Sequence, residues 1–195
     1  MTTPATAPLR ESMSDGKLRI RRYRTEDVDA LYRAVRESIS QVKRWAPWCH
    51  DDYSRRESES WIAGQQTAWD EGREYNFLIE DLGDGRRSGG RMLGGCGLNG
   101  IDPVNQRANL GYWVRTSATG RGVATAAALL VARFGFEELQ LARLEIVVAV
   151  GNTASQRVAA KTGAVREGIA RSRLLLYGVP RDAVISSLLR GEVPG

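Results

Sequence analysis

The sequence is poor in the residues that build metal centres and disulfide frameworks, because its 195 residues include one histidine and two cysteines. His50 is accompanied by no second histidine and by no Cys or Asp cluster at ligand spacing, so we predict no metal site. A His-based catalytic triad would have to be built on His50 alone. Cys49 and Cys96 are too few for a disulfide framework, and we expect both to be reduced and partly buried.

Long hydrophobic runs are also absent. The longest one, residues 123–132, is too short to span a bilayer. No basic segment followed by an apolar core opens the chain, which argues against a signal peptide. We therefore expect a cytoplasmic protein with no membrane contact.

Acidic residues are outnumbered, since 28 Lys and Arg stand against 23 Asp and Glu and give a net charge of +5. A net positive charge favours the binding of anionic ligands. A phosphate-rich cofactor is such a ligand and is enough to account for the charge, so we do not expect direct nucleic-acid binding. The hydrophobic content of 42% and the charged content of 26% are ordinary for a globular protein, and the length predicts one domain with a real core.

Composition and periodicity predict the organisation of the chain. Residues 1–16 are rich in Thr, Ala, Pro and Ser and predict a disordered tail, followed by one domain over 17–190 and a C-terminal tail over 191–195. Alternating and β-branched runs predict strands at 17–23, 74–80, 91–98, 110–114, 144–150, 169–177 and 183–189. The first four form a meander, and the last two form a long hairpin.

Helical spacing of apolar residues follows Thr25, Ser54 and Gly122, and a further short helix is expected to end at Gly163. Ser54 and Glu57 have the spacing of a capping box. Thr153 and Gln156 have the same spacing at the start of the short helix.

The most informative stretch is a glycine-rich turn between a strand and a helix, Thr119-Gly-Arg-Gly122-Val-Ala-Thr125. Such a turn exposes backbone N–H groups at the positive end of a helix, and its glycines let an anion come close. It lacks the Gly-Lys-Ser/Thr of nucleoside-triphosphate loops, and Thr125 stands where the dinucleotide fingerprint has a third glycine. The stretch predicts a phosphate site, with an ordinary glycine turn as the alternative.

A second strand-to-helix junction lies further along the chain. Residues 144–150 form an almost unbroken apolar run, typical of a strand buried on both faces. Asn152 and Ser155 follow it directly. Two such junctions place polar side chains beside the glycine-rich turn.

These residues, in this order, resemble the GNAT superfamily of acyl-CoA N-acyltransferases, and within it the branch of the RimJ and RimL acetyltransferases of ribosomal-protein N-termini. The turn is similar to the superfamily pattern Gln/Arg-x-x-Gly-x-Gly/Ala, with Thr119 in place of the usual first residue. The later pattern of the branch is matched by Asn152, Ser155, Val158, Lys161, Gly163, Glu167, Gly168, Arg171, Gly178, Asp182 and residues 187–189. The resemblance covers about Lys17 to Arg190.

The resemblance implies an α+β fold with three α/β/α layers. Its mixed, mostly antiparallel twisted sheet would carry helices on both faces and a cofactor wedge where the fourth strand splays from the fifth. The implied cofactor is acetyl-CoA, with coenzyme A as product and no metal. Backbone groups of Trp113, Val114 and Arg115 would hold the pantetheine arm.

The resemblance also implies contacts to the phosphates and the thioester. Asn152 would orient the pantetheine, and Ser155 would donate toward the sulfur; the alternative for Ser155 is a hydrogen bond to local backbone. Lys161 is a candidate contact for the outer phosphate. The pyrophosphate would lie on Gly120, Arg121, Gly122, Val123, Ala124 and Thr125, with a charge-assisted contact from Arg121.

Asn109 departs from many of these relatives, which carry Glu at this position in the series Glu-Ile-Gly-Tyr-Trp. Asn cannot accept a proton at neutral pH, so catalysis by water alone, or by a water held on Asn109, should favour weakly basic amines. Freeing a lysine amine costs about 3.4 kcal/mol more than freeing an α-amine at fixed pH. The alternative is that another carboxylate has taken over, for which Glu74 and Asp102 are the nearest candidates in the sequence.

The sequence therefore predicts an acetyl-CoA-dependent N-acetyltransferase that acts on a peptide N-terminal amine, with ribosomal proteins as the acceptor implied by the branch. A small amine such as a polyamine, or an aminoglycoside-type antibiotic, is the alternative acceptor. A CoA-binding module without catalysis is the alternative of another class. Trp45, Trp48 and Tyr112 are the candidate acceptor-binding residues, although the tryptophans could instead plug the space under a loop. The sequence does not determine the oligomeric state, and a homodimer is one possibility.

Overall fold

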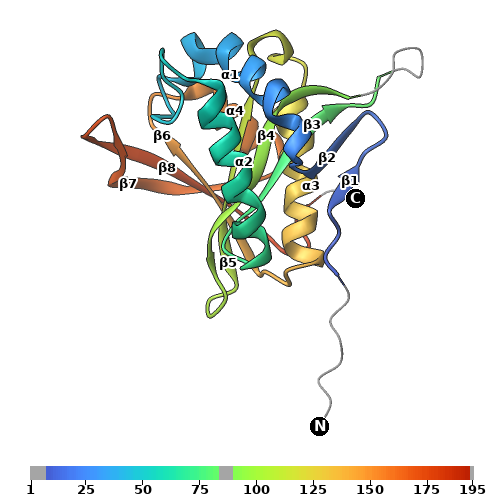
Figure 1. Cartoon of the computed structure of the whole chain (residues 1–195). Coiled ribbons are helices and arrows are strands. Elements are labelled where there is room, and N and C mark those ends of the chain that lie inside the picture. Colours follow the sequence, from blue (N-terminus) through green and yellow to red (C-terminus); the bar gives the residue numbers. More distant parts are fainter. Residues whose placement is uncertain (1–7, 84–89, 194–195) are drawn as a thin grey trace.

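The computed structural model describes residues 8–83 and 90–193, and its eight strands form one sheet in the order β1-β2-β3-β4-β5-β6-β8-β7 (Figure 1). Neighbouring strands are antiparallel except for β5 and β6, which are parallel. The strands are β1 (Ser12–Ser14), β2 (Leu18–Arg22), β3 (Tyr75–Asp81), β4 (Arg91–Asp102), β5 (Arg107–Val114), β6 (Arg143–Ala149), β7 (Val165–Leu176) and β8 (Val179–Leu189). The mixed, mostly antiparallel sheet predicted from the sequence is confirmed.

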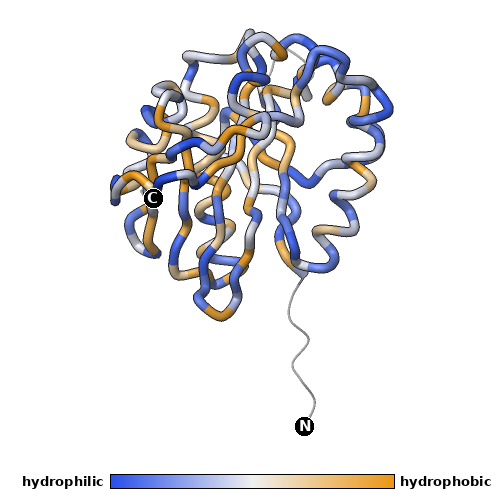
Figure 2. Tube along the Cα trace, turned by 90° about the vertical axis from the view of Figure 1, so that its left-hand side faces the viewer, coloured by the Kyte–Doolittle hydropathy of each residue, from blue (hydrophilic) through white to orange (hydrophobic). Residues whose placement is uncertain are grey.

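The helices in the described part of the chain cover both faces of this sheet. They are α1 (Val28–Val42), α2 (Arg55–Asp70), α3 (Val123–Glu137) and α4 (Thr153–Lys161), with 3₁₀ turns at Thr25–Asp27 and Thr116–Ala118. Leu78 packs with α1 and α2, whereas its neighbours Phe77 and Ile79 belong to the cluster around α3. Alternate side chains of one strand thus serve two cores, and hydrophobic residues recur along the central strands (Figure 2).

The meander β2 to β5 ends at the feature that positions the site. β5 pairs with β6 only over Arg107, Ala108 and Asn109, opposite residues 143–145. Beyond Asn109 the two strands have no paired residues, although β5 stays paired with β4 and β6 with β8. The wedge between the predicted fourth and fifth strands is therefore present between β5 and β6.

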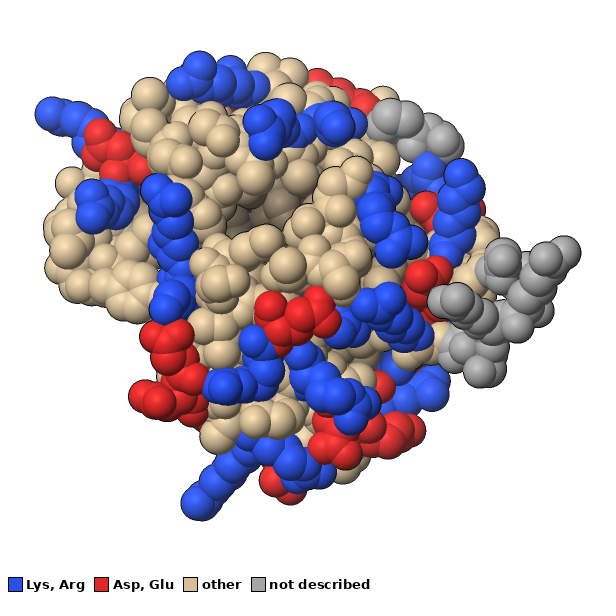
Figure 3. All heavy atoms as spheres, turned by 90° about the horizontal axis from the view of Figure 1, so that it is seen from above, with Lys and Arg blue, Asp and Glu red and all other residues tan. Residues whose placement is uncertain are grey.

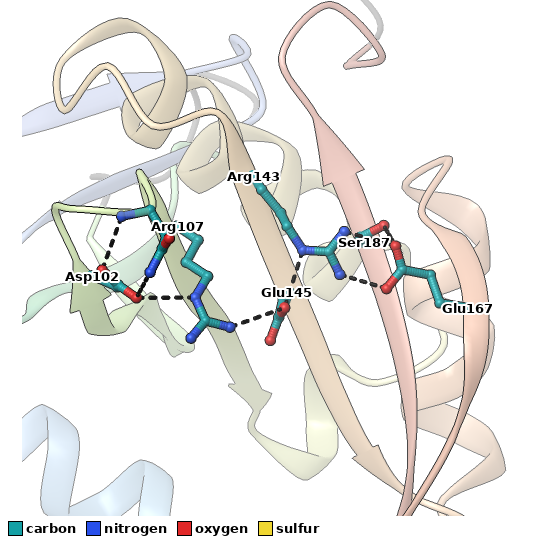
Figure 4. Close-up of polar contacts among 7 residues, drawn as sticks. Asp102, Arg107, Arg143, Glu145, Glu167 and Ser187 are labelled. Carbon is teal, nitrogen blue, oxygen red and sulfur yellow. Dashed lines mark hydrogen bonds and ion pairs between the residues drawn. The ribbon is translucent and has the colours of Figure 1, made fainter.

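Charged side chains tie the strands together below this opening (Figure 4). Arg107 Nη1 lies 3.7 Å from Glu145 Oε1 and so bridges β5 and β6. Arg143 donates to Glu145 over 3.0 Å and to Glu167 on β7 over 2.7 Å. Ser187 on β8 donates to Glu167 over 2.8 Å. We call these residues the ion ladder; it crosses β5, β6, β8 and β7.

The N-terminal segment differs from the sequence prediction. A disordered tail over residues 1–16 is wrong for residues 8–16, because β1 pairs with β2 and Leu9 packs against the core. Arg10 also donates to Glu138, the C-cap residue of α3, over 2.6 Å. Residues 1–7 of the predicted tail, and 194–195 of the C-terminal one, lie outside the described residues, whereas Val193 packs against the core.

Candidate active site

Helix α3 begins directly after the glycine-rich turn. Gly120 and Gly122 have φ angles of +74° and +79°, which side chains rarely adopt. No atom lies within 4 Å of the position that a Cβ would take on either residue. Gly122 is the N-cap and offers no capping side chain. The first N–H groups of α3 are therefore left without a side-chain cap beside open space, as an anion site requires.

A cleft of about 590 Å³, the wedge cleft, opens where β5 and β6 part. Residues predicted from the sequence line it as follows: Trp45, Asn109, Tyr112, Trp113, Val114, Gly120, Gly122, Val123, Ala124, Thr125, Asn152, Ser155 and Lys161. The lining contains Arg157 and Lys161 and no carboxylate among the described residues. A hollow bordered by Lys and Arg side chains is visible on the face shown in Figure 3.

Arg115 and Arg121 do not line the wedge cleft. The Arg115 backbone N–H donates to the Leu93 carbonyl over 2.8 Å, so it is not free for a pantetheine arm. The Arg115 guanidinium donates to Glu37 on α1, and this contact lowers the pKa of Glu37 to about 2. Arg115 therefore anchors the turn after β5 to α1. Arg121 is exposed beside the glycine-rich turn.

Asn152 and Ser155 lie at the start of α4, on the other side of the wedge. Asn152 is the N-cap, and its Oδ1 accepts from the Ser155 backbone N–H over 3.1 Å. The predicted capping box of Thr153 and Gln156 is wrong, because α4 begins at Thr153 with Asn152 as its cap. This cap fixes the start of α4 and leaves the Ser155 hydroxyl for another partner.

The partner of Ser155 is Tyr112 on β5. Ser155 Oγ donates to the Tyr112 hydroxyl over 3.1 Å, and that hydroxyl donates to the Ser155 carbonyl over 3.0 Å. Burial raises the pKa of Tyr112, which keeps the phenol protonated at neutral pH. Two protonated hydroxyls therefore bridge the wedge, and the Ser155 hydroxyl bonds across it instead of to its own helix backbone.

A second cleft of about 920 Å³ lies on the face of the sheet that carries α1 and α2. We call it the aromatic cleft, since Tyr23, Trp48, Tyr53, Trp61 and Trp113 line it. The rings of Trp48 and Trp113 are 5.7 Å apart, and Trp48 is 45% exposed. Such exposure is typical of a cleft wall and not of a plug under a loop.

The two clefts share part of their walls. Residues common to both linings are Trp45, Ala46, Asn109, Gly111, Tyr112, Trp113, Leu174 and Leu176. Trp45 packs against the backbone of Gly151, because its Cη2 lies 3.2 Å from the position of a Cβ there. A group bound in one cleft can therefore meet a group bound in the other near Tyr112.

Asn109 is the last residue of β5 that pairs with β6. Its Nδ2 donates to Asn99 Oδ1 over 3.1 Å. Its Oδ1 is buried and has no hydrogen-bond partner within the described residues. A buried acceptor without a donor costs free energy, so this atom is suited to receive an N–H from a bound molecule.

The single histidine also lines the aromatic cleft. His50 Nε2 and Glu57 Oε1 are 2.7 Å apart, and Glu57 completes the predicted capping box with Ser54 at the start of α2. No group of three or more metal-ligating side chains occurs in the part of the chain that the structure describes. Cys49 and Cys96 are free thiols, both buried. No helix among the described residues is long and apolar enough to cross a membrane.

This arrangement matches a known family model, the Acetyltransferase (GNAT) domain, over residues 17–165. The chain belongs to the GNAT acetyltransferase family. YdaF of Bacillus subtilis (strain 168), provisionally named a ribosomal N-acetyltransferase, is 40% identical over 106 residues. That match covers 54% of this chain and 58% of YdaF, so it spans little more than half of the relative.

Two further GNAT proteins are similar over more of the chain. YjcK of Bacillus subtilis, provisionally named an N-acetyltransferase, is 34% identical over 143 residues, which are 73% of this chain and 77% of YjcK. The structure of Mycobacterium smegmatis RimJ in complex with CoA-disulfide has a TM-score of 0.78 at 26% identity, covering 91% of this chain and 84% of RimJ. YdaF and YjcK are both named as N-acetyltransferases, so the N-acetyltransferase class is confirmed and a non-catalytic CoA-binding module is not favoured.

Several lining residues of this GNAT chain escaped the sequence analysis. Arg157 lies one helical turn before Lys161, a spacing that could have revealed it. Leu174 and Leu176 come from the far end of β7, and nothing in the local pattern places them over the clefts. Gly111 was predicted to lie in a strand and lies in β5, but the sequence did not show that the space at its Cβ position is open, with Asn99 Nδ2 3.9 Å away.

Proposed function

We propose that this protein transfers the acetyl group of acetyl-CoA to the N-terminal α-amine of a protein. The observation that carries the proposal is the meeting of two clefts, one with the glycine turn and one with an aromatic wall, at the Tyr112–Ser155 bridge. The name of YdaF, a ribosomal N-acetyltransferase, supports a ribosomal protein as the acceptor.

The wedge cleft fits acetyl-CoA. Open space above Gly120 and Gly122 leaves room for a pyrophosphate, and the N–H groups of Val123, Ala124 and Thr125 would bind it at the start of α3. Arg157 and Lys161 would contact the outer phosphate from α4, with Arg121 at the edge. Bound there, acetyl-CoA supplies a thioester carbonyl for attack by an amine and a thiolate as leaving group.

The residues of the bridge would handle the proton for that leaving group. Ser155 already donates a hydrogen bond, and Tyr112 can replace its proton, because both hydroxyls are protonated at neutral pH. Asn152 would hold the pantetheine beside them from the α4 cap. Backbone groups of Trp113 and Val114 on the free edge of β5 would pair with it on the opposite side.

The choice of an α-amine follows from acid–base energetics. An α-amine has a pKa near 8 and a lysine amine one near 10.4, so the neutral α-amine costs about 3.4 kcal/mol less to form. Asn109, at the position where many relatives carry Glu, cannot take up the proton itself, and the difference in cost between the two amines is the same for any other proton acceptor. A weakly basic amine is therefore the preferred acceptor.

The setting of the reaction follows from the same proposal. Acetyl-CoA and ribosomal proteins place it in the cytoplasm, and the free thiols of Cys49 and Cys96 suit that compartment. The basic wedge cleft is assigned to the phosphates, so the proposal includes no nucleic-acid partner. A homodimer stays a prediction that size measurements in solution would test.

A panel of acceptors tests the proposed function. Release of coenzyme A thiol from acetyl-CoA is measured with peptides that start with Ser or Ala, with aminoglycosides and with polyamines. We expect the highest kcat/KM for a peptide and little release from the same peptide with a blocked N-terminus. A kcat/KM that is highest for a polyamine or an aminoglycoside would contradict the proposal, as would the absence of release with every acceptor.

A further inference from the structure

The structure distinguishes between the two carboxylates that could replace the missing glutamate. Asp102 lies at the end of β4, where Asn105 and Arg107 donate to it and lower its pKa to about 2, and it lines neither cleft. Glu74 lies directly before β3 and lines the aromatic cleft. Its Oε2 accepts from Asn76 Nδ2 over 2.9 Å, and no described partner occupies Oε1.

Strand register places Glu74 and Asn109 on one face of the sheet. Asn76 is opposite Gly97 on β4, and Gly97 is opposite Gly111 on β5. Glu74 lies directly before β3, bonds to Asn76 and lines the same cleft, so the two side chains are on the same face. Asn109 precedes Gly111 by two residues on the same side. Two strand spacings, about 10 Å, separate the β3 backbone from the β5 backbone.

Carboxamides fill part of the space between these strands. A Cβ at Gly97 would clash with Asn76 Oδ1, so the carboxamide of Asn76 occupies the place of the missing side chain. Asn99 accepts from Asn109 on β5. We call Glu74, Asn76, Asn99 and Asn109 the amide row; it crosses β3, β4 and β5.

One end of the amide row is ready for an amine. The buried Oδ1 of Asn109 lacks a donor among the described residues, and Gly111 leaves open space next to it. The Tyr112 side chain, at the bridge to Ser155, points to the opposite face of β5 from Asn109 and Gly111, but all three residues line both clefts. An amine N–H donated to Asn109 would therefore lie where the two clefts meet, with the row leading away to Glu74.

We propose that Glu74 is the proton acceptor for the amine, through one or more water molecules held on the amide row. This inference rests on the proposed function. The acceptor ammonium gives one proton to a water, which passes a proton to Glu74 and leaves a neutral amine on Asn109 Oδ1. The amine nitrogen then forms the C–N bond and the C–S bond breaks. Ser155 gives its proton to the thiolate, and the second amine proton passes to Ser155 and restores its hydroxyl, so that the products are the amide and the free thiol of coenzyme A. Glu74 finally releases its proton to solvent.

Other titratable groups also face this cleft. They are His50 and Glu57 from the α1–α2 side, the buried Tyr23, Tyr53 and Cys96, and the partly buried Tyr112. Loss of solvent raises the pKa of each of the last four groups, so none of them is a base at neutral pH. Glu57 is held by Ser54 and His50. His50 is thus the main competitor of Glu74 and must be included in the test.

The test is the pH dependence of kcat/KM in Glu74→Gln, whose amide oxygen can still accept from Asn76. Two acceptors with amines about two pKa units apart are taken from those that the panel shows to react. We expect wild type to show an acidic inflection that stays in place when the acceptor changes. Glu74→Gln should lose it, with kcat/KM at pH 7 down ten- to a hundredfold and an unchanged KM for acetyl-CoA.

Glu71→Gln is the matched control, because Glu71 is an exposed acid nearby that pairs with Arg73 outside the cleft. It should keep the wild-type profile. The inference is overturned if Glu74→Gln keeps the inflection, if both variants lose equal activity, or if His50→Gln loses the inflection instead. A polyamine as the only reactive acceptor would contradict the proposed function, while the Glu74 test could still be made with it.

Binding without acetyl-CoA gives a second readout. A peptide with a free N-terminal ammonium and the same peptide acetylated are titrated calorimetrically into wild type and Glu74→Gln. We expect the free peptide to lose about three- to tenfold in affinity on substitution and the acetylated one to lose none, as for removal of one charged contact. Equal losses for both peptides would overturn the assignment.

Discussion

The hydroxyl of Ser155 belongs to α4, but its hydrogen-bond partner, Tyr112, belongs to β5. The sequence could place Ser155 in a functional motif, since the spacing from Asn152 is local. It could not supply the partner, because 43 residues separate the two positions and only the fold brings them together. Arg115 shows the opposite case: its motif position suggested a ligand contact, whereas the nearby acid Glu37 engages its side chain.

Ser155→Ala tests the bridge. If the hydroxyl serves the leaving thiolate, kcat should fall roughly ten- to a hundredfold with little change in KM for acetyl-CoA. Tyr112→Phe is the partner variant, and the double variant should lose less than the product of the single losses, because the two hydroxyls act as one unit. A loss confined to KM would assign Ser155 to binding alone.

Gly122→Val tests the phosphate site. A branched side chain would enter the open space before α3, so acetyl-CoA affinity should be lost. Strain at positive φ costs about 1–2 kcal/mol, less than the usual stability of a domain, so the variant should still fold. Gly16→Val is the control, since Gly16 has a φ of +87° and open space but lies in the β1–β2 turn. Calorimetric titration that gives wild-type affinity in folded Gly122→Val would contradict the assignment.

Among the elements, β5 and β6 form the wedge cleft because they pair over only part of their length. The sequence predicted both strands, the helix after each and the order of the meander, since periodicity and glycine positions are local signals. It missed β1, whose three residues form a strand only by pairing with β2. The sequence also did not predict how many residues of β5 and β6 pair. Only the resemblance to the GNAT superfamily implied that the two strands separate.

The ion ladder should make the wedge sensitive to acid. Arg143 lowers the pKa of Glu167 to about 2, below its usual value near 4.5. A carboxyl group whose pKa is lower in the folded state than in the unfolded state stabilises the folded state when it is ionised. The contribution of Glu167 to the free energy of unfolding is therefore complete above about pH 4.5 and is lost as the pH falls toward 2. Because the Glu167 side chain is 40% exposed, solvent screening keeps the effect modest.

Glu167→Gln tests this account of the ladder. We expect its unfolding temperature to lie below that of wild type at pH 7 and the difference to shrink between pH 4.5 and pH 2, as the wild-type carboxylate is protonated. Thermal unfolding followed by circular dichroism measures it. Glu192→Gln serves as the comparison, because within residues 8–83 and 90–193 the Glu192 carboxylate accepts only from the Leu189 backbone N–H. A difference that is constant with pH would contradict the role of the ladder.

On the scale of the whole molecule, the two clefts carry opposite charge. The wedge cleft is lined by Arg157 and Lys161, whereas the charged residues of the aromatic cleft are Glu57 and Glu74. An anionic donor and a cationic amine are thus drawn to different openings and meet near Tyr112. Composition alone gave the net charge of +5 but not this separation, because it depends on which helices the fold places beside each opening.

The central claim is that acetyl-CoA in the wedge cleft acetylates an α-amine presented from the aromatic cleft. Its most direct test uses one peptide that begins with Ser and contains one internal lysine, incubated with the enzyme and acetyl-CoA at neutral pH. Fragmentation mass spectrometry then locates the acetyl group. The account predicts acetylation of the N-terminal nitrogen with the lysine unmodified; acetylation of the lysine in preference to the N-terminus would contradict it.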